Sequence, residues 1–334
     1  MERVTIFGLE DWEKDYLAPL LEIPCEVFFC RNGLSAEIAS KFGDSEAISV
    51  FINDRVTPQV LGLMPGLKFI ATRSTGFDHI DLAACRQKGI MVSNVPSYGE
   101  STVAEHTFAL ILSLSRNIHK AYVRTAKGDF NLEGLMGFDL KGKTIGVIGA
   151  GHIGLHVVKM ARGFGMNVLV FDTRKDLFLE EIMAFKYAAF DELLGNSDII
   201  TLHVPYSEKT RHMINTGNIG RIKKGALLIN TARGGLVEPD ALTRALDEGI
   251  LSGAGLDVLE GEELIKEERE LLSKDFPADK MKSLLRNHIL MKRDDVVITP
   301  HIAFNSREAV QRILETTAEN IIGYLEGKPR NIVP

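Results

Sequence analysis

Three polar side chains that can do chemistry follow three predicted strands. Arg233, Glu262 and His301 each come shortly after an apolar run. A guanidinium is a permanently charged fork for oxygen anions, an imidazole exchanges a proton near neutral pH, and a carboxylate can hold an imidazole ring. Ligands of open parallel sheets lie beyond the carboxyl ends of the strands. The three residues are therefore candidates for one reaction site, although each taken singly is more often structural or solvated.

Two series of short apolar runs predict the elements that position these residues. Runs that are apolar on both faces are typical of a parallel sheet covered by helices, so each series predicts an α/β unit. Between them, Thr102-Val103-Ala104-Glu105 is a capping sequence that predicts the start of a linking helix. The first series comprises residues 4–7, 25–29, 47–52, 68–72 and 91–95, and the second comprises 144–149, 167–171, 198–204, 226–231, 253–258 and 296–299.

The end of the chain returns to the first unit in this prediction. Residues 307–324 carry an apolar stripe at helical spacing, which favours packing on the first sheet. We therefore predict one domain over 1–99 plus 300–334 and another over 100–299. The charged segment 260–295 predicts a solvated helical insertion, with a subunit contact or an active-site cover as alternatives.

A glycine loop predicts a dinucleotide site in the second domain. Gly149-Ala150-Gly151-His152-Ile153-Gly154 follows a predicted strand and leads into a helical pattern. The first glycine permits a tight turn, the second lets the main chain approach a pyrophosphate, and the third lets the helix pack closely on the strand. The helix start then presents N–H groups to phosphates. The candidate cofactor contacts are Gly149, Gly151, His152, Ile153 and Gly154.

An acidic residue selects between the two common dinucleotides. Asp172 ends the next predicted strand, 18 residues after Gly154, where a carboxylate can accept hydrogen bonds from the ribose hydroxyls. Because this carboxylate would repel a 2′-phosphate, the sequence favours NAD over NADP. Arg174 and Lys175 follow directly and leave NADP use open.

Composition excludes several classes of protein. The 334 residues carry 45 acidic and 39 basic side chains, a formal net charge of −6, so no overall positive field would gather nucleic acid or an anionic membrane. No apolar run approaches the length of a membrane span, and the first residues lack the organisation of a signal peptide. Three cysteines without metal or C-x-x-C spacing favour free thiols and predict a cytoplasmic protein. We expect no metal, because Ile153 stands where the zinc-protease pattern His152-x-x-x-His156 needs Glu.

Four motifs together resemble the D-isomer-specific 2-hydroxyacid dehydrogenases over nearly the whole chain. They are the glycine loop, Asn-Thr-Ala-Arg-Gly-Gly at 230–235, Gly-Leu-Asp-Val-Leu-Glu-Gly-Glu at 255–262, and Thr-Pro-His-Ile-Ala-Phe at 299–304. The resemblance implies two doubly wound parallel-sheet domains, an NAD-binding Rossmann domain at 100–299 and a flavodoxin-like substrate domain at 1–99 plus 300–334. It further implies a dimer. One departure is His152, where the family more commonly carries Arg or Asn.

The resemblance also assigns site residues. Arg233, Glu262 and His301 match the catalytic positions, and Arg233 and His301 also touch the substrate. Asp257 matches the residue that holds the nicotinamide carboxamide. The cofactor cleft matches His203, Val204, Pro205, Thr231, Ala232 and Arg233, and the substrate positions match Phe51, Thr75, Gly76, Tyr98 and Phe304.

Physical chemistry supports these roles. A 2-keto acid needs its carboxylate held and its carbonyl polarised, which the Arg233 fork can do. His301 can donate a proton to the carbonyl oxygen as hydride reaches C2, and an adjacent Glu262 would favour the imidazolium. Aromatic walls at Phe51 and Phe304 favour a small apolar substrate, and pyruvate fits best. We therefore expect a D-lactate dehydrogenase.

Other functions remain open from sequence. Pocket size discriminates homologous substrates weakly, so 2-hydroxyisocaproate, glycerate or glyoxylate are alternatives. A dinucleotide-sensing protein that resembles the family's transcriptional corepressors is another. Formate dehydrogenases share the fold but carry Gln where this chain has Glu262.

Overall fold

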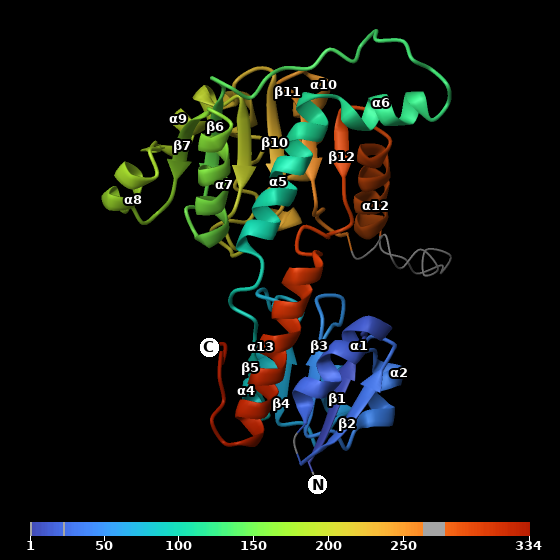
Figure 1. The fold of residues 1–334 in the computed structure, drawn as a ribbon. Coiled ribbons are helices and arrows are strands. Elements are labelled where there is room, and N and C mark those ends of the chain that lie inside the picture. Colours follow the sequence, from blue (N-terminus) through green and yellow to red (C-terminus); the bar gives the residue numbers. More distant parts are fainter. Residues whose placement is uncertain (1, 23, 263–277) are drawn as a thin grey trace. The chain divides into compact units, whose positions relative to one another are not determined.

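The computed structural model describes residues 2–22, 24–262 and 278–334, which form two compact units (Figure 1). Unit 1 comprises Met1–Gly99 and Asn305–Pro334, and unit 2 comprises Glu100–Phe304. Each unit contains one parallel sheet, which confirms the predicted fold class. Within the described ranges, no helix is both long enough and apolar enough to span a membrane.

Unit 1 is a five-stranded parallel sheet in the order β2-β1-β3-β4-β5. This order is that of flavodoxin-like folds. Its strands are β1 (Arg3–Phe7), β2 (Glu26–Cys30), β3 (Ala47–Val50), β4 (Phe69–Thr72) and β5 (Met91–Ser93). Its helices are α1 (Asp11–Leu17), α2 (Ala36–Ala39), α3 (Pro58–Gly62), α4 (Leu82–Gln87) and α13 (Arg307–Leu325), with the 3-10 turns η1 (Ala18–Leu21) and η2 (Ser40–Phe42).

Helix α13 brings the end of the chain back to unit 1, as its apolar stripe predicts. Ser306 caps the helix, because its hydroxyl accepts a hydrogen bond from the Ala309 N–H at 3.2 Å. Val310, Ile313 and Leu314 are buried, and the Tyr324 ring stacks on Phe69 of β4 at a centroid distance of 4.5 Å.

Unit 2 is a seven-stranded parallel sheet in the order β12-β11-β10-β9-β6-β7-β8. The order from β8 to β11 is that of the Rossmann fold, with β12 added at the edge. Its strands are β6 (Thr144–Ile148), β7 (Asn167–Phe171), β8 (Lys186–Tyr187), β9 (Ile199–Leu202), β10 (Ala226–Asn230), β11 (Leu251–Leu256) and β12 (Val296–Ile298). Its helices are α5 (Glu100–Ser115), α6 (Ile118–Thr125), α7 (His152–Gly163), α8 (Leu177–Ile182), α9 (Phe190–Asn196), α10 (Pro239–Asp247) and α12 (Ala278–Met291), with η3 (Ile219–Arg221) and η4 (Gly234–Leu236).

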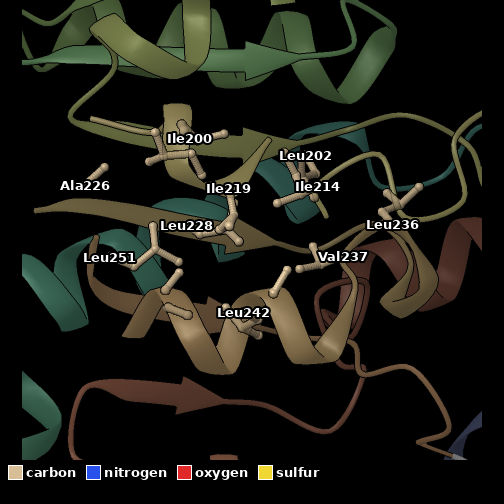
Figure 2. Close-up of a cluster of buried hydrophobic side chains, with 14 of the residues drawn as sticks. Ile200, Leu202, Ile214, Ile219, Ala226, Leu228, Leu236, Val237, Leu242 and Leu251 are labelled. Atoms are coloured by element: carbon tan, nitrogen blue, oxygen red, sulfur yellow. The ribbon is translucent and has the colours of Figure 1, made fainter. Parts of the chain in front are cut away.

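The strands of unit 2 bury side chains on both faces. Ile200, Leu202 and Leu228 pack into one cluster with Leu242 of α10 (Figure 2), while Ile199 and Leu227 pack into a second cluster with α5 and α7. Successive residues of a strand point to opposite faces, so a two-sided core requires a continuous apolar run. This burial explains why the second series of runs predicts the strands well.

Three details of the predicted organisation need correction or restriction. Helix α5 begins at Glu100, so Thr102 lies in its first turn; an acidic residue at the start suits the helix dipole. The second boundary lies after Phe304 rather than after residue 299, because the N–H groups of Ile302 and Ala303 bond to Asp257 of unit 2. The middle of the predicted insertion, 263–277, lies outside the described residues, and α12 follows it.

Candidate active site

The glycine loop connects β6 to α7, and its three glycines have different surroundings. Gly149 has a φ of +101°, and a Cβ there would lie 2.6 Å from the His203 carbonyl oxygen. A Cβ at Gly154 would lie 1.9 Å from the Gly149 carbonyl oxygen, so the helix could not pack this closely on the loop. At Gly151 a Cβ would meet no atom within 4 Å, which leaves that side of the backbone open. The loop therefore fits a dinucleotide pyrophosphate at the start of α7.

Asp172 follows β7 beside this loop. One carboxylate oxygen accepts the Ala150 N–H at 2.7 Å and the other accepts the Arg174 N–H at 2.8 Å. The carboxylate is thus fixed next to the glycine loop, where the acid of a ribose-binding site stands. His152, the first residue of α7, is 80% exposed in its side chain and lies 3.5 Å from Glu100.

The predicted walls of the cofactor cleft lie at the ends of β9 and β10. The His203 ring pairs with the Thr201 hydroxyl at 2.8 Å, and burial lowers the pKa of His203 to about 3, so the ring is neutral. A Cβ at Gly149 would also approach Val204 of the same segment, at 2.9 Å, and Pro205 follows. The Thr231 hydroxyl bonds to Thr107 of α5 at 3.0 Å, and Ala232 donates its N–H to Asn230 at 3.1 Å.

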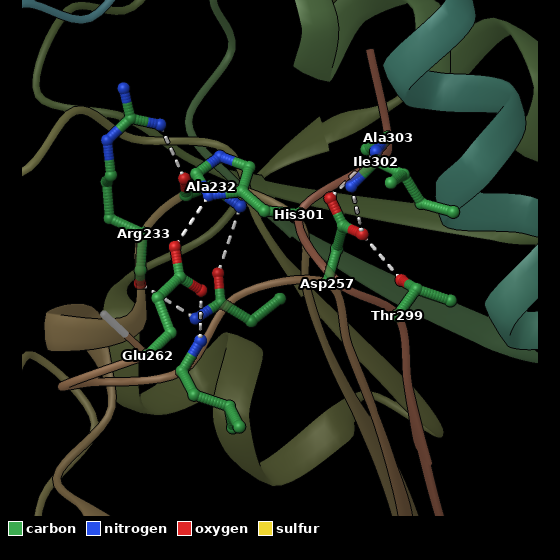
Figure 3. Close-up of polar contacts among 10 residues, drawn as sticks. Ala232, Arg233, Asp257, Glu262, Thr299, His301, Ile302 and Ala303 are labelled. Atoms are coloured by element: carbon green, nitrogen blue, oxygen red, sulfur yellow. Dashed lines mark hydrogen bonds and ion pairs between the residues drawn. The ribbon is translucent and has the colours of Figure 1, made fainter. Parts of the chain in front are cut away.

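Arg233 follows this segment directly and immediately precedes η4. Its guanidinium donates to the Ala232 carbonyl at 2.7 Å, and its own carbonyl accepts from the Asn230 side chain at 2.8 Å (Figure 3). The next residue, Gly234, packs so closely on the loop before Glu262 that a Cβ there would lie 2.1 Å from the Leu259 carbonyl carbon. The Arg233 loop and the Glu262 loop are therefore in contact.

Glu262 and His301 form an ion-pair geometry. The Glu262 carboxylate lies 2.7 Å from Nδ1 of His301, and its other oxygen accepts the Leu259 N–H at 3.0 Å (Figure 3). The side chains are 32% and 23% exposed. With Nδ1 directed to a carboxylate, Nε2 is the nitrogen placed for proton exchange with a ligand. Figure 3 shows these side chains and Arg233 gathered around Ala232.

Asp257 supports the turn that carries His301. It is 1% exposed and accepts hydrogen bonds from the Thr299 hydroxyl at 2.5 Å, from Ile302 N–H at 2.9 Å and from Ala303 N–H at 2.8 Å. Burial acts to raise the pKa of Asp257. The hydrogen bonds from His106, Thr299 and the two N–H groups outweigh burial and hold its pKa below the usual range, so the residue is a carboxylate. The contact to a nicotinamide carboxamide stays a prediction.

Two residues that contact Asp257 were not predicted from the sequence. His106 lies in α5, and its Nε2 is 3.0 Å from the Thr299 hydroxyl and 3.5 Å from Asp257. Nearly 200 residues separate His106 from Thr299, so no local spacing signals the contact. Thr299 adjoins His301 in the fourth motif, which was the available signal.

The predicted substrate residues divide between the units. Phe51 follows β3 and donates its N–H to Asp54 at 2.7 Å. Thr75 and Gly76 lie in the loop after β4, which is held by bonds from Thr75 to the Val95 carbonyl and from Ser74 to the Gly76 carbonyl. The Tyr98 carbonyl accepts from Arg312 of α13. These four positions belong to unit 1, whereas Phe304 belongs to unit 2 with Arg233, Glu262 and His301.

Comparisons with known proteins agree with this geometry. Residues 108–303 match the family described as D-isomer specific 2-hydroxyacid dehydrogenase, NAD binding domain. The chain is 37% identical to 2-hydroxyacid dehydrogenase A of Aspergillus oryzae, over 96% of this chain and 91% of that protein. It is 38% identical to a glyoxylate reductase of Thermofilum pendens, over 87% and 82% of the two chains.

A solved structure is also similar over nearly the whole chain. D-lactate dehydrogenase of Aquifex aeolicus, crystallised with NAD and lactic acid, superposes with a TM-score of 0.85 at 38% identity and covers 97% of this chain and 96% of its own. NAD is the cofactor of this chain, since its glycine loop and Asp172 lie in the matched NAD-binding domain. The chain belongs to the D-isomer-specific 2-hydroxyacid dehydrogenase family.

Proposed function

We propose that the protein reduces pyruvate to D-lactate reversibly, with His301 as the acid and base. The nicotinamide supplies or receives the hydride at C2 of the substrate. His301 gives a proton to the carbonyl oxygen in reduction and recovers it from the hydroxyl in oxidation. The observation that carries the proposal is the 2.7 Å pairing of His301 with Glu262 in the same unit as the NAD loop.

Arg233 and Glu262 prepare this proton transfer. The Arg233 fork can bind the substrate carboxylate and polarise its carbonyl. Glu262 fixes the imidazole through Nδ1, which leaves Nε2 to exchange the proton with the substrate oxygen. In this proposal the N–H groups of Thr75 and Gly76 receive the carboxylate, and the Tyr98 hydroxyl also contacts the substrate.

The choice of pyruvate rests on the aromatic positions Phe51 and Phe304. A cation, Arg73, lies 5.8 Å from the centre of the Phe51 ring. Its guanidinium is buried and already donates to the Ser49 hydroxyl and the Phe7 carbonyl. Since these partners already take N–H groups of the buried guanidinium, a second carboxylate on the substrate would find few donors there, and a methyl group suits the aromatic ring.

The substrate test is a panel of keto acids with NADH. We expect kcat/KM for pyruvate to exceed the values for 2-ketoisocaproate, glyoxylate and hydroxypyruvate, and the product to be D-lactate. Dominance of hydroxypyruvate or glyoxylate would replace the lactate assignment.

His301→Gln should lose about 10²- to 10⁴-fold in kcat while NADH still binds. If the native protein reduces no keto acid but binds NADH and a peptide, the corepressor-like alternative holds.

We also propose a cytoplasmic homodimer. Cys25, Cys30 and Cys85 are free thiols, as a reducing compartment predicts. A run of exposed apolar side chains lies on α6 and the segment after it: Ile118, Tyr122, Val123, Phe130, Leu132 and Met136. Such surfaces are typical of subunit contacts. Sedimentation equilibrium should give twice the chain mass, and Phe130→Ser with Leu132→Ser should shift the mass toward the monomer.

A further inference from the structure

A chain of polar contacts connects helix α5 to the turn that carries His301. Nε2 of His106 lies 3.0 Å from the Thr299 hydroxyl, and that hydroxyl donates to Asp257 at 2.5 Å. Because the single hydroxyl proton of Thr299 goes to Asp257, its oxygen accepts from His106, and His106 therefore carries a proton on Nε2. All three residues lie in unit 2.

The turn needs this support because its conformation is unfavourable. His301 has a φ of +57°, in the left-handed region that residues with a Cβ seldom adopt. Its N–H donates to the Asp257 carbonyl at 2.9 Å, and the next two N–H groups donate to the Asp257 carboxylate. Asp257 thus holds both sides of the strained residue, and its own carboxylate oxygen Oδ1 is held by Thr299 and lies 3.5 Å from His106.

We propose that His106 is a positioning residue that acts through Thr299 and Asp257 on His301. The chain of contacts fixes the left-handed turn, which keeps Nδ1 on Glu262 and presents Nε2 to the reacting carbonyl. The inference rests on the proposed function, since it assigns His106 to the proton transfer of that reaction. It predicts that loss of His106 lowers the rate of the chemical step more than it weakens the binding of pyruvate or NADH.

The experiment compares variants of the full-length protein in steady-state reduction of pyruvate. His106→Leu removes the donor, and His106→Gln retains an N–H at the place of Nε2. Displacement of a catalytic group by about 1 Å can cost roughly 100-fold, so we expect His106→Leu to lose about 10- to 100-fold in kcat. The KM for pyruvate and the Kd for NADH should change little, and His106→Gln should recover most of the rate.

Two control variants separate an effect on catalysis from an effect on folding: His119→Leu is matched to His106→Leu, and Thr299→Ser is matched to Thr299→Val. His119 follows the opposite end of α5, and its two ring nitrogens lie 3.1 and 2.9 Å from the carbonyl oxygens of Ser113 and Asp294. His119→Leu should lower stability while leaving kcat unchanged. Thr299→Val should reproduce the loss of His106→Leu, whereas Thr299→Ser, which keeps the hydroxyl, should not.

A double-mutant cycle separates this inference from the proposed function. In a His301→Gln background, His106→Leu should cause almost no further loss, because its effect passes through His301. Additive losses, or a raised Kd for NADH with kcat unchanged, would overturn the positioning role. Full activity of His301→Gln alone would instead overturn the acid–base assignment.

Discussion

Arg233 combines a fixed backbone with a side chain that extends from a loop. Its carbonyl is held by Asn230 and its guanidinium donates to the Ala232 carbonyl. The planar guanidinium fork can form a bidentate contact to a substrate carboxylate, which a lysine ammonium cannot reproduce. The geometry of the guanidinium, as well as its charge, therefore matters for binding.

Arg233→Lys should raise the KM for pyruvate. Hydrogen bonds to charged groups contribute about 1.5–3 kcal/mol, so kcat/KM is expected to fall about 10- to 100-fold. Steady-state kinetics with saturating NADH measure the effect, and the Kd for NADH, followed by nucleotide fluorescence, is the control. An unchanged KM would show that Arg233 does not hold the substrate carboxylate.

Among the elements, the junction of β6 with α7 separates two roles of glycine. Gly154 faces the Gly149 carbonyl at a distance that excludes a methyl group, whereas Gly151 has a φ of −70° and open space on its Cβ side. Gly154 is therefore needed by the fold, whereas Gly151 is needed by the ligand. Substitution of each by alanine tests this division.

Gly151→Ala should weaken NADH binding without unfolding the protein. We expect a rise in Kd of about 10-fold or more, with less than about 1 kcal/mol lost from the free energy of unfolding. Gly154→Ala should lose about 1–3 kcal/mol or more, because helix or loop must shift. NADH titration and urea unfolding of both variants measure the contrast; equal losses of stability would refute it.

Sequence patterns predict the elements where local chemistry dictates them. Continuous apolar runs identify β6, β9 and β10, because these strands are buried on both faces. The two-residue edge strand β8 was not predicted, since Lys186 and Tyr187 show no such run. The placement of residues 300–304 in unit 2 depends on bonds to Asp257, more than 40 residues away, and no local pattern contains that information.

In the site, too, some contacts can be predicted from local sequence patterns and others cannot. The pairing of Glu262 with His301 follows from two strand ends at one edge of a parallel sheet, so sequence can anticipate it. The contact of His106 with Thr299 depends on how α5 lies on the sheet. Helix packing of this kind is fixed by the whole core and has no signature in spacing.

For the molecule as a whole, the two units differ in how the chain builds them. Unit 2 is one continuous segment, while unit 1 is completed only by the last thirty residues. Val310, Ile313 and Leu314 of α13 are buried, and the helix packs against α1 and β4, so unit 1 cannot complete its core without residues 307–325. Truncation before α13 should therefore expose apolar surface of unit 1.

Stability of the whole protein should depend on His203 at acidic pH. Burial lowers the pKa of His203 to about 3 in the folded protein, against about 6.5 in an unfolded chain. Between these values the unfolded state binds a proton that the folded state does not. The free energy of unfolding therefore falls as the pH decreases from 6.5 toward 3, by at most about 1.4 kcal/mol per pH unit from this residue.

His203→Gln removes the contribution of His203 to this pH dependence, because glutamine does not titrate. Its amide can still reach the Thr201 hydroxyl. Urea unfolding at pH 7.5, 6.5, 5.5 and 4.5, without NADH, should show a shallower acid loss in the variant than in the native protein. The difference at pH 7.5 measures the packing cost alone, since both proteins are then neutral at this position. All other titrating groups are shared, so parallel pH profiles would mean that the folded protein accepts a proton on His203.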